Sequence, residues 1–165
     1  MKKKLLHYAK EIALFFIVMT IFANIMSWYK SQDLNKEKIP IKQARLINNK
    51  EFLLDTSAPT LVHIWASWCP TCSIEAQNIQ TLSKHYSTIT IAVKSGSDLD
   101  IKNYLDEKNL NFAVINDKHG EYAKKFNISA YPTTLIYDKN GELVFSEVGY
   151  TSTLGLFLRM WWASL

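Results

Sequence analysis

The hydrophobic positions of this chain fall into two different patterns. Residues 12–29 are almost entirely apolar and carry no charge, and they lack the polar face that a surface helix of a soluble protein shows. From about residue 44 onward, short runs of β-branched and aromatic residues alternate with segments whose apolar positions recur every three or four residues. This alternation predicts strands interleaved with helices, and therefore a mixed sheet with helices on both faces.

The predicted elements after residue 44 follow the order β-hairpin, βαβ, inserted helix and strand, short helix, and ββα. The expected strands occupy residues 44–47, 51–54, 61–66, 88–93, 112–115, 133–137 and 143–148. The expected helices occupy residues 70–86, 98–109, 120–126 and 152–163. Asp98 is expected to cap the second of these helices.

The last predicted helix contains more apolar residues than one core-facing stripe needs. Helical spacing predicts that one set faces the core, namely Leu154, Phe157, Leu158 and Trp161. The apolar residues left over are Leu156, Trp162 and Leu165. They are candidates for a patch that faces a membrane or a partner.

The charge-free run of residues 12–29 predicts a single transmembrane helix. At 1.5 Å per residue it spans about 27 Å, slightly less than an average hydrocarbon core. Lysines precede the run and place the N-terminus in the cytoplasm. The expected organisation is a cytoplasmic basic tail (1–11), a transmembrane anchor (12–29), a tether (30–43) and a folded domain (44–165).

A cleaved signal peptide is the alternative interpretation of the apolar run. However, no pair of small residues closes the run, and no cysteine marks a lipoprotein cleavage site. The net charge of +4 does not predict nucleic-acid binding, because residues 1–58 hold ten Lys and Arg against five Asp and Glu. Residues 59–165 hold nine against ten, so the folded part has no basic excess.

The chain has two cysteines, Cys69 and Cys72, separated by Pro70 and Thr71. A predicted buried strand ends just before Cys69, and Pro70 suits the first turn of a helix because its missing N–H leaves no hydrogen bond unmade. Cys69 would thus lie at a helix N-terminus, where free N–H groups and the helix dipole favour a thiolate. Cys72 lies one turn along, so the two sulfurs can bond. The pattern predicts a reversible dithiol/disulfide pair and no metal, because a zinc site would need two more ligands and the histidines are scattered.

The residues around this pair resemble the thioredoxin superfamily. The matching segments are Trp65-Ala66-Ser67-Trp68-Cys69-Pro70-Thr71-Cys72, Glu75, Ala130-Tyr131-Pro132-Thr133-Thr134 and Asp138-Lys139-Asn140-Gly141. The chain is most similar to the membrane-anchored, extracytoplasmic branch with TlpA-like, ResA-like and suppressor-of-copper-sensitivity D-type proteins. The resemblance covers residues 45–163 and implies an α/β thioredoxin fold with the inserted helix and strand of the TlpA-like branch.

The resemblance also implies the roles of individual residues. Cys69 would attack a substrate disulfide and Cys72 would resolve the mixed disulfide. Pro132 would be a cis-proline beside the sulfurs that exposes backbone to a substrate strand. The residues implied to contact substrate are Trp68, Pro70, Thr71 and Tyr131.

His63 and Glu75 are the two candidates for moving a proton. His63 stands six residues before Cys69, where thioredoxins proper have a buried Asp, so a carboxylate acceptor cannot be carried over. A neutral imidazole would accept the proton of Cys72, whereas a core histidine bonded to a backbone carbonyl is the alternative. Glu75 matches an acidic position of the TlpA-like branch, and a surface glutamate in the second helical turn is the alternative.

The implied function is thiol:disulfide exchange with exported proteins, without a cofactor, on the periplasmic side of the cytoplasmic membrane. A membrane electron carrier would reset the cysteine pair. One alternative is a thiol reductant of cytochrome c maturation, but such proteins typically have Gly-Ala-Pro-Glu-Thr where this chain has residues 130–134. Another is a copper or haem chaperone that uses the thiolates as soft ligands.

Overall fold

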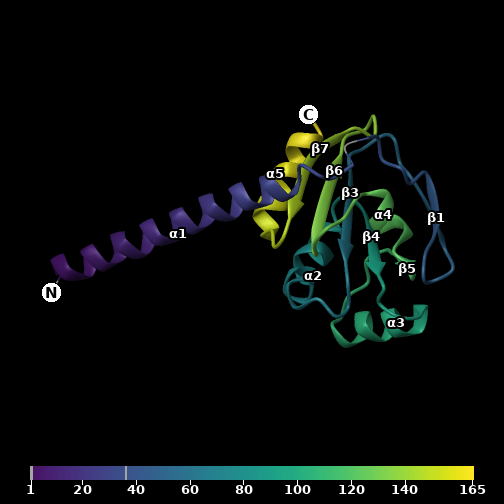
Figure 1. Cartoon of the computed structure of the whole chain (residues 1–165), viewed down its shortest axis with the longest axis horizontal. Helices are drawn as coiled ribbons and strands as arrows, with labels where there is room; N and C mark the ends of the chain where they lie inside the picture. The colour runs from purple at the N-terminus through teal and green to yellow at the C-terminus, as the bar shows by residue number, and fades with distance from the viewer. Residues whose placement is uncertain (1, 36) are drawn as a thin grey trace.

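The computed structural model describes residues 2–35 and 37–165 and consists of a long N-terminal helix attached to an α/β domain (Figure 1). The helix, α1, is Lys2–Lys30. Its stretch Lys10–Ser27 has the length and the apolar composition of a membrane span, and the described side chains of residues 10–22 and 24–26 are exposed. These side chains are therefore not part of the core of the domain.

A five-stranded mixed sheet with the order β5-β4-β3-β6-β7 forms the centre of the domain. Its strands are β3 (Thr60–Trp65), β4 (Ser87–Val93), β5 (Val114–Asp117), β6 (Thr133–Tyr137) and β7 (Leu143–Val148). β3, β4 and β5 run parallel, and β6 is antiparallel to both β3 and β7. β3 is buried along its whole length because both faces are covered, which explains its uninterrupted apolar sequence.

Helices cover both faces of this sheet. The larger group packs on one face and consists of α2 (Pro70–Leu82), α3 (Asp98–Glu107) and α5 (Thr153–Ala163). The short helix α4 (Glu121–Lys125) packs on the other face. The predicted mixed sheet, its flanking helices and the inserted helix and strand, α3 and β5, are confirmed.

Several predicted element ends differ from the structure, and so does one predicted helix cap. α3 is capped by Ser97, whose Oγ accepts from the N–H of Asp100 at 3.2 Å while the Asp100 carboxylate accepts from the Ser97 N–H at 2.7 Å. This capping box makes the prediction of Asp98 as the cap wrong. α2 ends at Leu82, because the carbonyl of Leu82 accepts from two N–H groups that follow in a turn. β5 lies two residues later than predicted, in register with Thr90 of β4.

The predicted core face of the last helix is wrong for three of its four residues, and only Phe157 packs against the core. Leu156 and Met160 are fully buried, whereas the predicted core residues Leu154, Leu158 and Trp161 are exposed. Two apolar faces made the hydrophobic pattern ambiguous. The rotation of α5 about its own axis is fixed by the loop that precedes it. Asn78 of α2 donates to the carbonyl of Thr151 in that loop at 2.9 Å.

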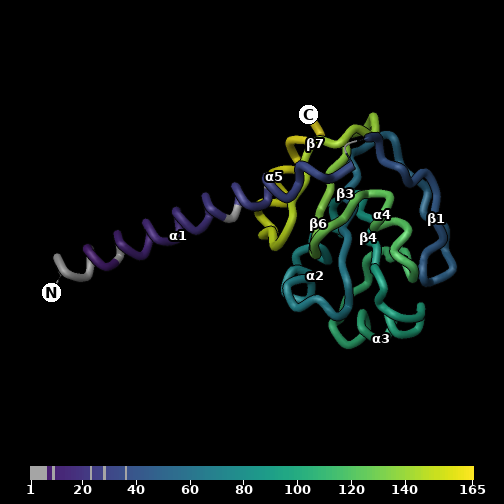
Figure 2. The backbone as a smooth tube through the Cα atoms, viewed as in Figure 1, coloured from purple at the N-terminus to yellow at the C-terminus, as the bar shows by residue number. Residues whose placement is uncertain are grey.

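The segment between α1 and the domain is not a free tether. Leu34, Ile39 and Ile41 are buried in the core cluster on the α4 face of the sheet. The N–H of Ile39 donates to the carbonyl of Gly141 at 2.9 Å. Figure 2 shows the segment crossing the domain from the end of α1 to the hairpin. The predicted tether, residues 30–43, is mostly polar and charged, and its composition therefore gave no indication that three of its side chains are buried.

The predicted N-terminal hairpin is present but forms its own small sheet. β1 (Gln43–Arg45) and β2 (Glu51–Leu53) pair antiparallel. The N–H of Ile47, in the turn between them, donates to the carbonyl of Val114 at 3.0 Å. This bond attaches the hairpin to the β5 edge of the main sheet.

Candidate active site

The two cysteines lie where β3 passes into α2. Cys69 is the N-cap of α2, and its Sγ accepts from the N–H of Cys72 at 3.2 Å. Pro70 occupies the first turn, as predicted. The chain closes the pair as a Cys69–Cys72 disulfide, which the sequence predicted.

The two sulfur-bearing residues differ in accessibility. Cys69 is 6% exposed and Cys72 only 1% exposed. Both cysteines belong to the core cluster that β3 and α2 share, and Cys72 lies one turn further into α2. Cys69 is therefore the cysteine that a second thiol or disulfide can reach first.

A second loop lies against the CxxC segment. It carries the cis peptide bond Tyr131–Pro132, which confirms the predicted isomer. The ring of Tyr131 meets the ring of Trp68 edge-on, with centroids 5.6 Å apart and an interplanar angle of 89°. The carbonyl of Pro132 accepts from the N–H of Gly149 at 2.8 Å, so the loop is also fixed to the end of β7.

The predicted substrate-contacting residues surround Cys69. Pro70 and Thr71 are exposed on the first turn of α2, and Trp68 is exposed beside them. The indole N–H of Trp68 donates to the carbonyl of Lys94 at 3.2 Å, which holds the ring in place. The ring contact between Trp68 and Tyr131 thus joins the CxxC segment to the cis-proline loop.

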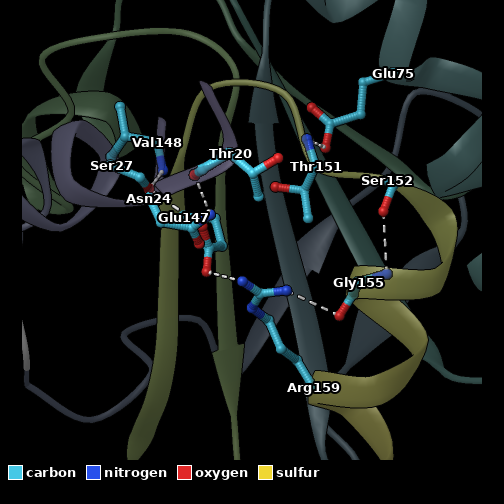
Figure 3. Close-up of polar contacts among 10 residues, drawn as sticks. All are labelled: Thr20, Asn24, Ser27, Glu75, Glu147, Val148, Thr151, Ser152, Gly155 and Arg159. Carbon is cyan, nitrogen blue, oxygen red and sulfur yellow. Dashed lines mark hydrogen bonds and ion pairs between the residues drawn. The ribbon is translucent and has the colours of Figure 1, made fainter. Parts of the chain in front are cut away.

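Glu75 is fully buried in α2, one turn after Cys72, so the alternative of a surface glutamate is wrong. Its Oε1 accepts from the N–H of Thr151 at 3.1 Å, and its Oε2 has no hydrogen-bond partner within residues 2–35 and 37–165 (Figure 3). Burial raises the pKa of Glu75 to about 8. The Thr151 hydrogen bond opposes this rise, and the charge of Glu147 adds to it. Glu75 is therefore mostly a neutral acid at pH 7.

His63 is buried in β3 and bonds to a side chain rather than to a backbone carbonyl. Its Nδ1 lies 2.9 Å from Oγ1 of Thr134, the residue opposite it in β6. Burial lowers the pKa of His63 to about 3, so the ring is neutral at pH 7. His63 shares a sheet face with Leu61 and Trp65, which pack against α2. Within the described chain no hydrogen bond joins it to a cysteine.

Some partners in this region were not identified from the sequence. Thr134 was part of the recognised motif, but nothing marked it as the partner of His63. Thr151 binds Glu75 through its backbone N–H, which leaves no signature in the side-chain sequence. Glu147 and Arg159 form an ion pair at 2.6 Å that is largely buried, next to α1 (Figure 3). Glu147 and Arg159 lie on different elements, so no local sequence pattern predicts that they form an ion pair.

The mixed sheet, the CxxC disulfide at the start of α2 and the adjacent cis-proline define a thioredoxin-like protein. The chain belongs to the Redoxin family, whose family model matches residues 37–154.

Known relatives agree with this assignment. The chain is 31% identical over 163 residues to a thioredoxin-like protein of Haemophilus influenzae, covering 98% of this chain and 96% of the relative. It is 22% identical over 144 residues to sporulation thiol-disulfide oxidoreductase A of Bacillus subtilis, covering 80% and 87% of the two chains. The crystal structure of StoA from Bacillus subtilis has a similar fold, with a TM-score of 0.66, 20% identity, and coverage of 74% of this chain and 98% of that chain.

The burial of Glu75 predicts a pH-dependent stability. The pKa of Glu75 rises from 4.5 to about 8 on folding. Its contribution is therefore fully present below pH 4.5 and is lost as the pH rises through about 8. Glu75→Gln cannot ionise, so its melting temperature should fall less than that of the wild type between about pH 5 and about pH 9. Thermal unfolding of the oxidised full chain in detergent measures this difference.

The matched control is Glu121→Gln, which alters an exposed glutamate on α4. It should keep the pH dependence of the wild type. If Glu75→Gln keeps that dependence as well, Glu75 is not the group responsible.

Proposed function

We propose that this protein is a thiol:disulfide oxidoreductase that exchanges disulfides with exported proteins outside the cytoplasmic membrane. The observation that carries the proposal is the Cys69–Cys72 disulfide, with Cys69 at the N-cap of α2 and the cis-Pro132 loop beside it. The relative named as a thiol-disulfide oxidoreductase supports the same chemistry.

The exchange proceeds through a mixed disulfide. In the reduced protein, the Cys69 thiolate attacks one sulfur of a substrate disulfide, and the other substrate sulfur leaves as a thiolate that takes up a proton. Cys72 then loses its proton and attacks the Cys69 sulfur. The Cys69–Cys72 disulfide forms, the substrate leaves as a dithiol, and two electrons have passed to the substrate. A membrane electron-transfer partner then reduces the pair again.

Glu75 fits the proton transfer of the resolving step better than His63. Proton transfer costs least between groups of similar pKa. An ordinary thiol has a pKa of about 8.5, close to the value of about 8 for Glu75. The pKa of His63, lowered to about 3, makes its imidazole a weak base. We therefore propose that the ionised form of Glu75, which is the minor form at pH 7, accepts the proton that Cys72 loses in this step. His63 is the residue that positions the β6 end of the site through its contact with Thr134.

The apolar composition and the flanking charges of α1 support the proposed location outside the membrane. Its charge-free part is preceded by lysines, which favours a cytoplasmic N-terminus and a domain on the opposite side. The periplasmic location, the exported substrates and the electron-transfer partner belong to this proposal.

The different accessibility of the cysteines predicts different trapping behaviour. Cys72→Ser leaves Cys69 able to attack but removes the resolving thiol, so mixed disulfides with exported proteins should accumulate. Cys69→Ser should accumulate fewer, because Cys72 is even less exposed than Cys69 and does not lie at the open end of α2. Non-reducing gels of membranes after acid quenching measure both, with the double variant as the blank. Trapping by Cys69→Ser alone would reverse the two roles.

The proposed proton carrier predicts the rate of resolution. Glu75→Gln should slow the resolving step by about 10²-fold, the lower end for general acid–base catalysis, without slowing the attack by Cys69. His63→Asn should lower the melting temperature and change the resolution rate much less. Rapid-quench kinetics of a preformed mixed disulfide separate the steps. If His63→Asn slows the resolving step and Glu75→Gln leaves its rate unchanged, the proton transfer belongs to His63 instead.

The proposed anchor predicts a defined topology. A reporter that is active only outside the cytoplasm, fused after the last residue, should be active, and the full chain should stay in the membrane during alkaline extraction. Release of a shortened soluble form would show that residues 12–29 are a cleaved signal peptide.

A further inference from the structure

The outward side of α5 and its last turn forms a continuous apolar stripe. The side chains that make it up are more than half exposed: Leu154, Leu158, Trp161, Trp162 and Leu165. Their spacing of i, i+4, i+7, i+8 and i+11 places them along one side of a helix, away from the buried Leu156 and Met160. Two adjacent exposed tryptophans leave a large apolar area in contact with water unless another surface covers them.

The only charged residue of α5 is not part of this stripe. Arg159 pairs with Glu147 of β7 at 2.6 Å and donates to the carbonyl of Gly155 at 3.0 Å (Figure 3). Both partners of the ion pair are largely buried, with side-chain exposures of 23% and 16%. The charge is therefore neutralised next to α1, and the stripe itself carries none.

The position of α5 relative to α1 determines which side of the domain the stripe faces. α5 lies on the side of the domain from which α1 leaves, and it runs across the direction of α1 (Figure 1). A groove of about 780 Å³ between them is lined by α1 residues from Phe16 to Lys30 and by Gly155 and Arg159 of α5. Since the core side of α5 packs on the sheet, the stripe faces the way that α1 extends from the domain.

The level of α5 along α1 is fixed by hydrogen bonds. Oγ of Ser27 accepts from the N–H of Val148 at 2.9 Å and donates to Glu147 at 3.1 Å. Ser27 lies two residues before the end of the charge-free run 12–29. The end of β7, and α5 that follows it, therefore lie where α1 would leave the hydrocarbon.

We propose that this stripe is a second membrane-contact surface, which lies in the lipid interface beside α1. The proposal rests on the membrane anchor of the proposed function. A helix that lies in the plane of the interface inserts its apolar face by about 5–10 Å, and tryptophan is enriched at this depth. The domain is then held against the bilayer at two places and has one fixed orientation.

A second copy of the chain fits the stripe less well than lipid. Copies anchored in one bilayer have parallel α1 helices and meet side by side, whereas α5 lies on the side of the domain from which α1 leaves. The tryptophan pair and the absence of charge also match the lipid interface.

Tryptophan quenching in the full chain tests the proposal. Wild type and a Trp161→Phe/Trp162→Phe variant are reconstituted in vesicles of phosphatidylcholine and phosphatidylglycerol, and the difference between their spectra is the emission of the two stripe tryptophans. Vesicles whose phosphatidylcholine carries bromine high on the acyl chains should quench most of this emission. Acrylamide, which stays in water, should quench little of it.

Two further variants test the stripe without altering its tryptophans. Leu154→Glu/Leu158→Glu places carboxylates on the stripe, so bromine quenching should fall and acrylamide quenching should rise. Leu99→Glu is the control, because Leu99 is similarly exposed, at 65%, but lies on α3. It should behave as the wild type.

Each other outcome overturns the proposal. Stripe emission that acrylamide quenches and bromine does not would place the stripe in water. Emission protected from both quenchers would mean that protein, such as a second copy, covers it. The anchor is tested separately by Trp28, within the run 12–29: without bromine-sensitive emission in the Trp161→Phe/Trp162→Phe variant, the anchor itself fails.

Discussion

The cap of α2 by the sulfur of Cys69 is the interaction on which the site depends. A helix begins with unpaired N–H groups, and the Cys69 Sγ accepts from one of them, that of Cys72. The same N–H groups stabilise negative charge on that sulfur once the disulfide is reduced. One atom, the Sγ of Cys69, therefore both caps α2 and carries out the reaction, and the fold places it shortly after the buried strand β3.

The buried carboxyl of Glu75 connects this site to the rest of the domain. Its hydrogen bond to Thr151 reaches the loop between β7 and α5, which Gly149 also ties to the cis-Pro132 loop. Leaving one carboxylate oxygen without a partner in a buried place costs stability when the group ionises. Such a cost is tolerable at a site that needs a group able to gain and lose a proton near neutral pH.

The sequence allowed the central part of the fold and site to be predicted. The buried strand, the CxxC helix and the cis-proline loop have strong local signals, because each depends on neighbouring residues. The rotation of α5 had no such signal, since both of its faces are apolar and a loop contact through Asn78 selects one. Likewise, the burial of Ile39 and Ile41 and the pairing of Glu147 with Arg159 depend on tertiary contacts between distant segments.

The packed segment after α1 has a consequence for how the protein meets its partners. Eleven free residues would let a domain move through about 36 Å above a membrane. Here Leu34, Ile39 and Ile41 bind that segment to the domain, so this freedom is absent. With α1 in the bilayer, as proposed, Cys69 stays at one height and searches by lateral diffusion. Its partners are then selected by how far above the lipid they carry their disulfides, as well as by the chemistry of those disulfides.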